Sequence, residues 1–278
     1  MQKDDKILDD KQMINLTEKA KQIRKNALIG IYNAKSGHPG GSLSCADIMA
    51  YLYFCEMNLA ENPQDNTRDR FVLSKGHAAP ALYAALALKG YFNVNELANL
   101  RKIGHMLQGH PDMIKVPGVD MSTGSLGQGI SAAVGMATSF KADNLPNRTY
   151  CITGDGELQE GQVWEAAMFA AHNNLANLTV IIDNNGLQID GKLSDVNSPE
   201  PIDAKFIAFG WDCIIVDGHD FKDLERGFNY AKQSSKPTVI IAKTAKGKGV
   251  SFMEDNPNWH GVAPNEEEFK KAMSELDI

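Results

Sequence analysis

The sequence has few cysteines and none in a paired motif. Its four cysteines, Cys45, Cys55, Cys151 and Cys213, are far apart in the chain and form no Cys-x-x-Cys pair. A chain of 278 residues can bury a sizeable hydrophobic core without disulfide bonds. Because free cysteine is among the residues most often buried, we expect reduced, mostly buried thiols in a cytoplasmic protein.

Long apolar segments are also missing. No run approaches the roughly 20 apolar residues that a transmembrane helix needs. The N-terminus, MQKDDKILDDKQ, is charged and lacks the apolar core of a signal peptide. We therefore expect neither a membrane-bound protein nor a secretory leader.

The sequence contains no internal repeat and no low-complexity tract. It has fewer positively charged than negatively charged residues. Lysine and arginine total 28 against 35 aspartates and glutamates, which gives a net charge of -7. A general nucleic-acid-binding protein must neutralise phosphates, so this balance argues against that class. A local basic pocket for a phosphorylated ligand remains compatible with it.

The apolar pattern predicts strands that alternate with helices. Predicted helices cover 12–35, 44–57, the alanine-rich segment from about 78 to Leu88, 128–142, 160–174 and 220–234. Predicted strands cover 70–74, 149–153, 178–183, 212–217 and 237–243. Loops are predicted at Ser36–Gly41 and 104–125, and a tail from about 250 should hold an extended segment and a short final helix. We expect one α/β domain over 1–278, with a mostly parallel sheet and helices on both faces.

A polar turn follows the strand predicted at 149–153. Asp155 lies between Gly154 and Gly156, and Asn185 follows thirty positions later, after another apolar strand. Carboxylate and amide oxygens are ligands that Mg²⁺ prefers, often together with substrate phosphates. The helix predicted from Glu160 directs backbone N–H groups and a positive dipole end toward this region, which suits an anion. The combination is much more specific than a Gly-Asp-Gly turn alone.

In this order the segments resemble the fingerprint of thiamine diphosphate enzymes, and the whole chain resembles the diphosphate-binding region of transketolase. Further motifs of that family are matched by Ser36-Gly37-His38-Pro39-Gly40-Gly41, Phe71-Val72-Leu73-Ser74-Lys75-Gly76-His77, Gly109-His110-Pro111, Ser122-Thr123-Gly124-Ser125-Leu126-Gly127-Gln128-Gly129 and Trp259-His260-Gly261. One departure is Ser125, since many members have proline there. The fold that the resemblance implies is the thiamine diphosphate-binding fold.

The resemblance also implies a set of site residues. The metal, Mg²⁺ with Ca²⁺ or Mn²⁺ as alternatives, would be held by Asp155, Asn185 and the backbone carbonyl of Leu187. The residues implied to bind thiamine diphosphate are His77, Gly124, Ser125, Leu126, Asp155, Gly156, Asn185, Lys246 and His260. The residues implied in catalysis are His38, His77, His110, His260 and Glu160. Glu160 is expected to be a buried acid at a subunit interface, linking two active sites.

Several other polar residues have simpler interpretations. Lys75, Lys243 and Lys246 could hold a diphosphate or could belong to solvated basic loops, and the sequence leaves both open. His105, His172 and His219 lie outside the matched motifs, so we expect surface or satisfied core positions for them. The helical spacing of Trp164, Ala167, Met168 and Ala171 predicts packing on one helix face.

The activity implied is that of a transketolase dependent on thiamine diphosphate and Mg²⁺, as in the pentose phosphate pathway. It would transfer a two-carbon ketol unit from a ketose phosphate such as xylulose 5-phosphate to an aldose phosphate such as ribose 5-phosphate. The sequence stops soon after Trp259-His260-Gly261, at less than half the length of a transketolase. We therefore expect the N-terminal subunit of a split transketolase, inactive alone and completed by a C-terminal pyrimidine-binding subunit in a heterotetramer.

Two alternatives remain. One is half of another thiamine diphosphate enzyme, of the 2-oxo-acid dehydrogenase or deoxyxylulose-phosphate synthase type. The segments Ser36–Gly41, Lys75-Gly76-His77 and Trp259-His260-Gly261 favour transketolase over these. The other alternative is a cofactor-binding subunit without catalysis, against which the metal ligands and the four motif histidines argue.

Overall fold

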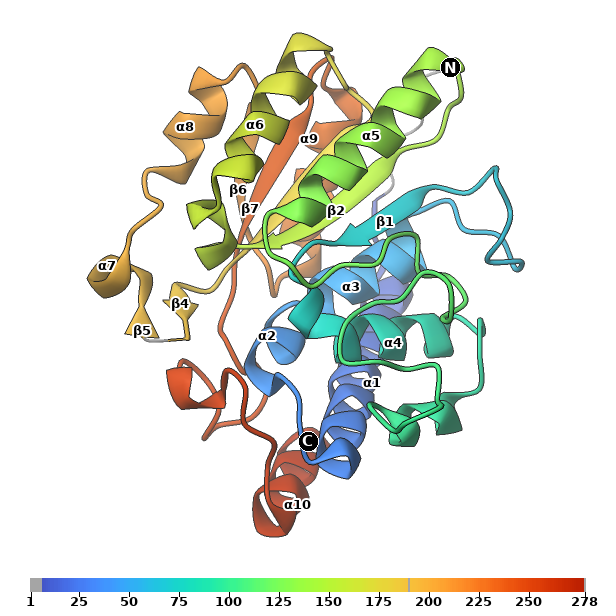
Figure 1. Cartoon of the computed structure of the whole chain (residues 1–278), viewed down its shortest axis with the longest axis vertical. Helices are drawn as coiled ribbons and strands as arrows, with labels where there is room; N and C mark the ends of the chain where they lie inside the picture. Colours follow the sequence, from blue (N-terminus) through green and yellow to red (C-terminus); the bar gives the residue numbers. More distant parts are fainter. Residues whose placement is uncertain (1–6, 190, 278) are drawn as a thin grey trace.

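The structure is a computed structural model that describes residues 7–189 and 191–277, and its centre is a five-stranded parallel sheet (Figure 1). The strands are β1 (Arg70–Leu73), β2 (Thr149–Gly154), β3 (Leu178–Asn184), β6 (Asp212–Asp217) and β7 (Thr238–Lys243). Their order in the sheet is β1-β2-β3-β7-β6. A separate antiparallel pair, β4 (Leu187–Gln188) and β5 (Gly191–Lys192), follows β3. The predicted parallel sheet and its strand positions are confirmed.

The pattern of burial explains why β3 lies in the middle of the sheet. Every residue of β3 is buried, as expected for a parallel strand covered on both faces. The register places Gly154 beside Asp183, and Asn184 beside Lys243. Polar residues therefore gather where β2, β3 and β7 end, along one edge of the sheet.

Helices cover both faces of the sheet, as predicted. On one face the core contains residues of α1 (Asp10–Ala34), α3 (Ala46–Tyr51), α4 (Ala79–Leu88) and α9 (Phe221–Gln233). On the other it contains residues of α5 (Gln128–Ala142), α6 (Gly161–His172) and α8 (Ile202–Ala208). Successive strand residues alternate between these cores: Ile181 packs into the first, while Val180 and Ile182 pack into the second.

Helix α1 and the C-terminal tail meet in a small third core. Helix α1 begins with a capping box in which the Asp9 carboxylate accepts from the Gln12 amide N–H at 2.7 Å. The tail contains the 3₁₀ turn η5 (Pro257–Trp259) and the final helix α10 (Glu266–Glu275). Leu28 of α1 packs with Ala272 of α10 and with Met253. The predicted final helix is confirmed.

The loop predicted at Ser36–Gly41 is in part wrong, because helix α2 (Pro39–Ser44) begins within it. Proline fits the first helical position, where no intrahelical N–H bond is lost. The two glycines in the helix allow close packing: a Cβ on Gly40 would lie 3.0 Å from the Trp259 carbonyl, and one on Gly41 would lie 3.2 Å from His77 Nε2. The helix predicted at 44–57 is accordingly divided into α2, α3 and a π-helical turn, η1 (Leu52–Glu56).

Short elements were not predicted, because they span too few residues for a periodic pattern. They are the hairpin β4–β5, α7 (Leu193–Val196), α8 and the 3₁₀ turns η2 (Gly76–Ala78), η3 (Val94–Asn99) and η4 (Gly156–Gln159). The long loop predicted at 104–125 is confirmed. Among the described helices, none combines the length and apolar content that crossing a membrane requires.

The packing predicted along α6 is wrong for one residue. The Trp164 ring stacks on the Phe209 ring, with the centroids 5.7 Å apart, and Ala167 is buried. Met168, however, is 52% exposed beside the exposed Phe169, because the buried stripe of the helix consists of Val163, Ala166, Ala167 and Ala170. This stripe is displaced by about one position from the one inferred from the sequence.

The thiols agree with the sequence-based prediction. Cys45 and Cys151 are buried, and Cys55 and Cys213 are half-buried. None of these four described cysteines forms a disulfide.

Candidate active site

A cavity of about 340 Å³ lies beyond the ends of β2 and β3. The predicted site residues that line it are His38, His77, Gly124, Leu126, Asp155, Gly156, Glu160, Asn185, Leu187, Lys246 and His260. His110 and Ser125 are not among the lining residues. The structure therefore brings together residues from seven separate parts of the sequence, as expected for a site at the carboxyl edge of a parallel sheet.

Asp155 lies at the floor of this cavity. Its side chain is buried, and its carboxylate accepts from the amide N–H groups of Gly156 at 2.8 Å and Gly186 at 2.6 Å. Burial raises the pKa of Asp155 to about 6, although the two amides oppose this shift. A bound cation would stabilise the ionised carboxylate that burial disfavours, so this residue fits a metal ligand.

The other predicted metal ligands face Asp155 from the loop after β3. The Asn185 side-chain oxygen accepts from the Leu187 amide at 3.1 Å, and Leu187 itself lines the cavity. One carboxylate, one amide oxygen and one carbonyl oxygen form a hard donor set of the kind Mg²⁺ takes. Within residues 7–189 and 191–277, no three His, Cys, Asp or Glu side chains are grouped to hold a metal. On the chemistry of its donors, the oxygen set at Asp155 is the candidate metal site.

Two loops meet closely at the cavity wall because glycines allow it. A Cβ on Gly76 would lie 2.7 Å from the amide nitrogen of Gly124. Gly124 has a φ of +152°, which other residues rarely adopt. Through this close contact His77, Gly124 and Leu126 line the same cavity.

Three histidines form a cluster in the cavity. The ring centroids of His38 and His77 are 5.3 Å apart, those of His38 and His260 are 5.4 Å apart, and those of His77 and His260 are 5.2 Å apart. Burial is the main cause that lowers the pKa of His38 and of His260 to about 4, and it lowers the pKa of His77 well below its usual value. All three rings are therefore neutral at pH 7.

His110 lies next to this cluster, outside the cavity lining. A Cβ on Gly124 would lie 3.1 Å from the His110 ring. Burial, followed by the charge of Arg101, lowers the pKa of His110.

His38 Nδ1 is buried without a hydrogen-bond partner among the described residues, which marks a polar atom available to a ligand.

Lys246 projects into the cavity from the loop after β7. Its side chain is buried, its Nζ lies 3.0 Å from His260 Nδ1, and it donates to the Leu187 carbonyl at 3.4 Å. Burial lowers the pKa of Lys246 to about 8. A solvated loop position is excluded for Lys246. Lys243 is half-exposed and contacts Asn184, outside the cavity lining.

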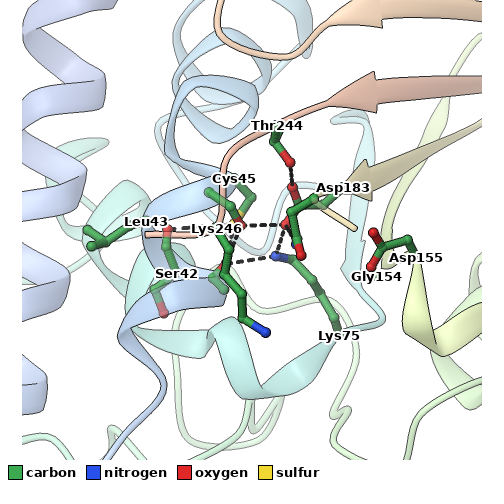
Figure 2. A network of polar contacts seen from close by, with 12 residues as sticks. Ser42, Leu43, Cys45, Lys75, Gly154, Asp155, Asp183, Thr244 and Lys246 are labelled. Atoms are coloured by element: carbon green, nitrogen blue, oxygen red, sulfur yellow. Dashed lines mark hydrogen bonds and ion pairs between the residues drawn. The ribbon is translucent and has the colours of Figure 1, made fainter. Parts of the chain in front are cut away.

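Lys75 lines the cavity and belongs to a buried polar network that extends beneath it (Figure 2). Its ammonium forms an ion pair with the Asp183 carboxylate and donates to the Gly41 carbonyl at 2.7 Å. Asp183 also accepts from the hydroxyls of Ser44 and Thr244, each at 2.5 Å. Burial alone would raise the pKa of Asp183, but Lys75 and these hydrogen bonds bring it below the usual value. A solvated position is thus excluded for Lys75 as well.

Glu157 is a buried residue of the site that the sequence did not reveal. Its carboxylate accepts from the Ser74 hydroxyl at 2.5 Å and from the amides of Gly127 at 2.8 Å and Gly154 at 3.0 Å. It therefore connects the ends of β1 and β2 to the start of α5. The signal in the sequence that could have revealed Glu157 is its position two residues after Asp155, directly after Gly156.

Glu160 is exposed at the cavity in this chain, at the position that precedes α6. Its expected burial involves a subunit interface, so that role stays a prediction. Its side chain lies over Gly127, where a Cβ would meet the Glu160 Cβ at 2.7 Å. No other part of the described chain covers this residue, so burial of Glu160 needs a second chain.

The remaining histidines have the positions expected of them. His105 and His172 are exposed. His219 is half-buried, with Nδ1 2.6 Å from the Asp47 carboxylate and Nε2 2.8 Å from the Ala245 amide nitrogen. It is thus a satisfied histidine outside the cavity.

The arrangement of these residues agrees with a known family. The family described as "Transketolase, thiamine diphosphate binding domain" matches residues 16–278. The chain belongs to this transketolase family. The family match, the α/β fold and the similarity to transketolase subunits confirm the resemblance stated from the sequence.

Two of the similar proteins are separate subunits of nearly the same length. The chain is 48% identical over 268 residues to the 6-deoxy-6-sulfo-D-fructose transketolase subunit SqwG of Clostridium sp. strain MSTE9, covering 96% of this chain and 98% of SqwG. It is 41% identical to one of the subunits of the apulose-4-phosphate transketolase of Phocaeicola vulgatus, over 95% of each protein.

Other similar proteins are longer. Human transketolase is 45% identical over 255 residues, which cover 91% of this chain and 40% of the human protein. The crystal structure of transketolase from Campylobacter jejuni subsp. jejuni NCTC 11168 superposes with a TM-score of 0.88 at 36% identity, over 95% of this chain and 43% of that one. The chain thus spans about 40% of the transketolases to which it aligns in this way.

The network beneath the cavity predicts a large loss of stability for Lys75→Met. Because the substitution leaves the Asp183 carboxylate buried without its ammonium, the free energy of unfolding should fall by about 3–5 kcal/mol in urea denaturation. The double variant Lys75→Met/Asp183→Asn should recover part of this loss. Lys271→Met, at an exposed surface pair, serves as the control and should change stability by less than about 0.5 kcal/mol. A Lys75→Met variant as stable as this control would contradict the assigned role of the ion pair.

Proposed function

We propose that this chain is the N-terminal, diphosphate-binding subunit of a transketolase that depends on thiamine diphosphate and Mg²⁺. The observation that carries the proposal is the cavity in which His38, His77, His260 and Lys246 face the oxygen donors at Asp155. It combines groups for a cation, for a diphosphate and for a polyhydroxylated substrate within one space. Membership of the transketolase family supports the same reaction type.

In this proposal the floor of the cavity holds the metal and the diphosphate. Asp155, Asn185 and the Leu187 carbonyl are the metal ligands, with Mg²⁺ proposed because the donors are all oxygen. The Lys246 ammonium and the backbone of Gly156 both line the cavity and are assigned to the diphosphate. When bound, thiamine diphosphate supplies the electron sink needed to break the carbon–carbon bond of a ketose.

The histidines are assigned to the substrate. A neutral imidazole has one nitrogen that donates and one that accepts, so it can orient a sugar hydroxyl and exchange its proton. His38 and His260 are neutral at pH 7 and border the same space, and the unpartnered Nδ1 of His38 is available for such a bond. His77 and His110 complete the set of residues proposed to act on the substrate.

A second chain is proposed to complete the site. Two similar proteins named as transketolase subunits match this chain over nearly their whole length, whereas human transketolase extends far beyond it. The partner would supply the pyrimidine-binding half, and the assembly would be a heterotetramer with two copies of each chain. The exposed Glu160 at the cavity is the residue we assign to the interface between subunits.

A cytoplasmic location is proposed from the reduced thiols.

The donor substrate is proposed to be a ketose with a terminal anionic group. Transfer from xylulose 5-phosphate to ribose 5-phosphate is the first candidate, as for a transketolase of the pentose phosphate pathway. A second candidate is 6-deoxy-6-sulfo-D-fructose, because the subunit named for that substrate is 48% identical over 96% of this chain. The two donors differ in the anion, a phosphate or a sulfonate, and in carbon number, five or six, and can be compared directly.

Removal of the Asp155 carboxylate should abolish metal-dependent cofactor binding. In isothermal titration of the chain assembled with its C-terminal subunit, Asp155→Ala should weaken the affinity for thiamine diphosphate with Mg²⁺ at least about 100-fold, since a buried charged ligand is lost. The control Asp143→Ala removes an exposed carboxylate and should leave the affinity unchanged. Unaltered affinity in Asp155→Ala would refute the metal assignment.

Assembly should determine activity. The chain alone should transfer no ketol unit, and addition of the C-terminal subunit should produce transfer with xylulose 5-phosphate or with 6-deoxy-6-sulfo-D-fructose as donor and ribose 5-phosphate as acceptor. The ratio of kcat/KM for the two donors identifies the preferred donor. Ketol transfer by the purified chain without a partner would disprove the two-chain proposal, and no transfer by the assembly with any ketose donor would disprove the transketolase proposal.

A further inference from the structure

A row of polar contacts connects helix α1 to the loop that carries Lys246. The Arg24 guanidinium donates to the Asp47 carboxylate at 3.0 and 2.5 Å. The other partner of Asp47 is His219 Nδ1 at 2.6 Å, and the Ala245 amide donates to His219 Nε2 at 2.8 Å. The row ends at Ala245, the residue before Lys246. His219 itself does not line the cavity.

The two contacts of His219 determine its tautomer. A backbone N–H can only donate, so His219 Nε2 must carry a lone pair toward Ala245. Asp47 is an acceptor, because Arg24 and the other donors bring its pKa below the usual value despite burial. His219 Nδ1 therefore carries the proton and donates to Asp47. The ring is neutral and has a fixed orientation.

The loop after β7 is held by hydrogen bonds on both sides of Lys246. The Thr244 hydroxyl donates to Asp183 at 2.5 Å, and the Gly247 amide donates to the Gly40 carbonyl at 3.0 Å. Gly247 has a φ of +81°, and a Cβ there would lie 2.3 Å from the Met253 carbonyl. Between these two attachments, the Ala245 amide is held by His219, and the Lys246 carbonyl accepts from the Asp255 amide at 2.9 Å.

We propose that His219 is a positioning residue for Lys246. The neutral Nδ1–H tautomer, fixed by Asp47, accepts the Ala245 amide and so orients the loop that places the Lys246 ammonium in the cavity. The consequence for the cofactor rests on the proposed function, because it takes Lys246 as a ligand of the diphosphate. The effect on the loop itself is independent of that function.

Two substitutions separate the roles of the two ring nitrogens. Gln at position 219 places an amide oxygen near the position of Nε2 and can still accept from Ala245. Asn places its amide near the position of Nδ1 and keeps only the contact with Asp47. If His219 acts through the loop, Gln should preserve the loop and Asn should not, whereas a general packing role would be disturbed by both substitutions.

The test measures hydrogen exchange of the Ala245 amide and, separately, binding of thiamine diphosphate with Mg²⁺ to the chain assembled with its C-terminal subunit. In His219→Asn, exchange at Ala245 should rise about two- to tenfold, the range expected for one lost hydrogen bond, and the affinity should fall by a similar factor. His219→Gln should stay within about twofold of the native chain in both measurements. His172→Asn, which replaces an exposed histidine, is the control.

The outcomes are distinguishable. Native exchange at Ala245 in His219→Asn, or equal increases in the Asn and Gln variants, would overturn the positioning role. Faster exchange in His219→Asn with unchanged cofactor affinity would overturn the connection to Lys246 while leaving the loop contact in place. Absence of cofactor binding by the native assembly would instead contradict the proposed function, and the exchange data would still decide the role of His219 in the loop.

Discussion

The buried ion pair between Lys75 and Asp183 is the interaction on which the cavity depends. Lys75 follows β1 and Asp183 lies near the end of β3, so the pair ties together two strands separated by β2. Through the Gly41 carbonyl and the Thr244 hydroxyl, the same two side chains also hold α2 and the loop after β7. Desolvation makes such a pair costly unless its other hydrogen bonds are made, and here they are made. The elements that deliver His38, His77 and Lys246 are therefore attached to a common buried centre.

Two neighbouring carboxylates lie at the proposed cation site and differ in their surroundings. Asp183 and Asp155 lie on adjacent strand ends, and both are buried. Lys75 and several donors keep the pKa of Asp183 low, whereas the pKa of Asp155 is raised to about 6 because burial outweighs the two amides that it accepts. One carboxylate is thus neutralised within the chain and the other is suited to a metal. The neutral histidines add polar groups to the cavity without adding positive charge that would oppose that metal.

The sequence predicted the sheet and most of the site because both leave local signals. Apolar runs such as Leu178–Asp183 show the buried strands, and loops at the ends of parallel strands must meet at one edge. Contacts between distant segments left no such signal. The role of Glu157 depends on three loops, the burial of Lys75 depends on Asp183, and the helix at Pro39–Ser44 depends on close packing against His77 and Trp259. Met168 was misplaced because helical spacing defines a stripe but not which side of it faces the core.

The proposed metal donors at Asp155 connect the fold to the proposed chemistry, so the location of the bound cation tests the account most directly. Mn²⁺ can replace Mg²⁺ at oxygen sites and gives an anomalous X-ray signal. In crystals of the assembled protein grown with thiamine diphosphate and Mn²⁺, the account predicts an anomalous peak in contact with Asp155, Asn185 and the Leu187 carbonyl. A peak at another set of residues, or cofactor bound without a cation at these donors, would contradict it.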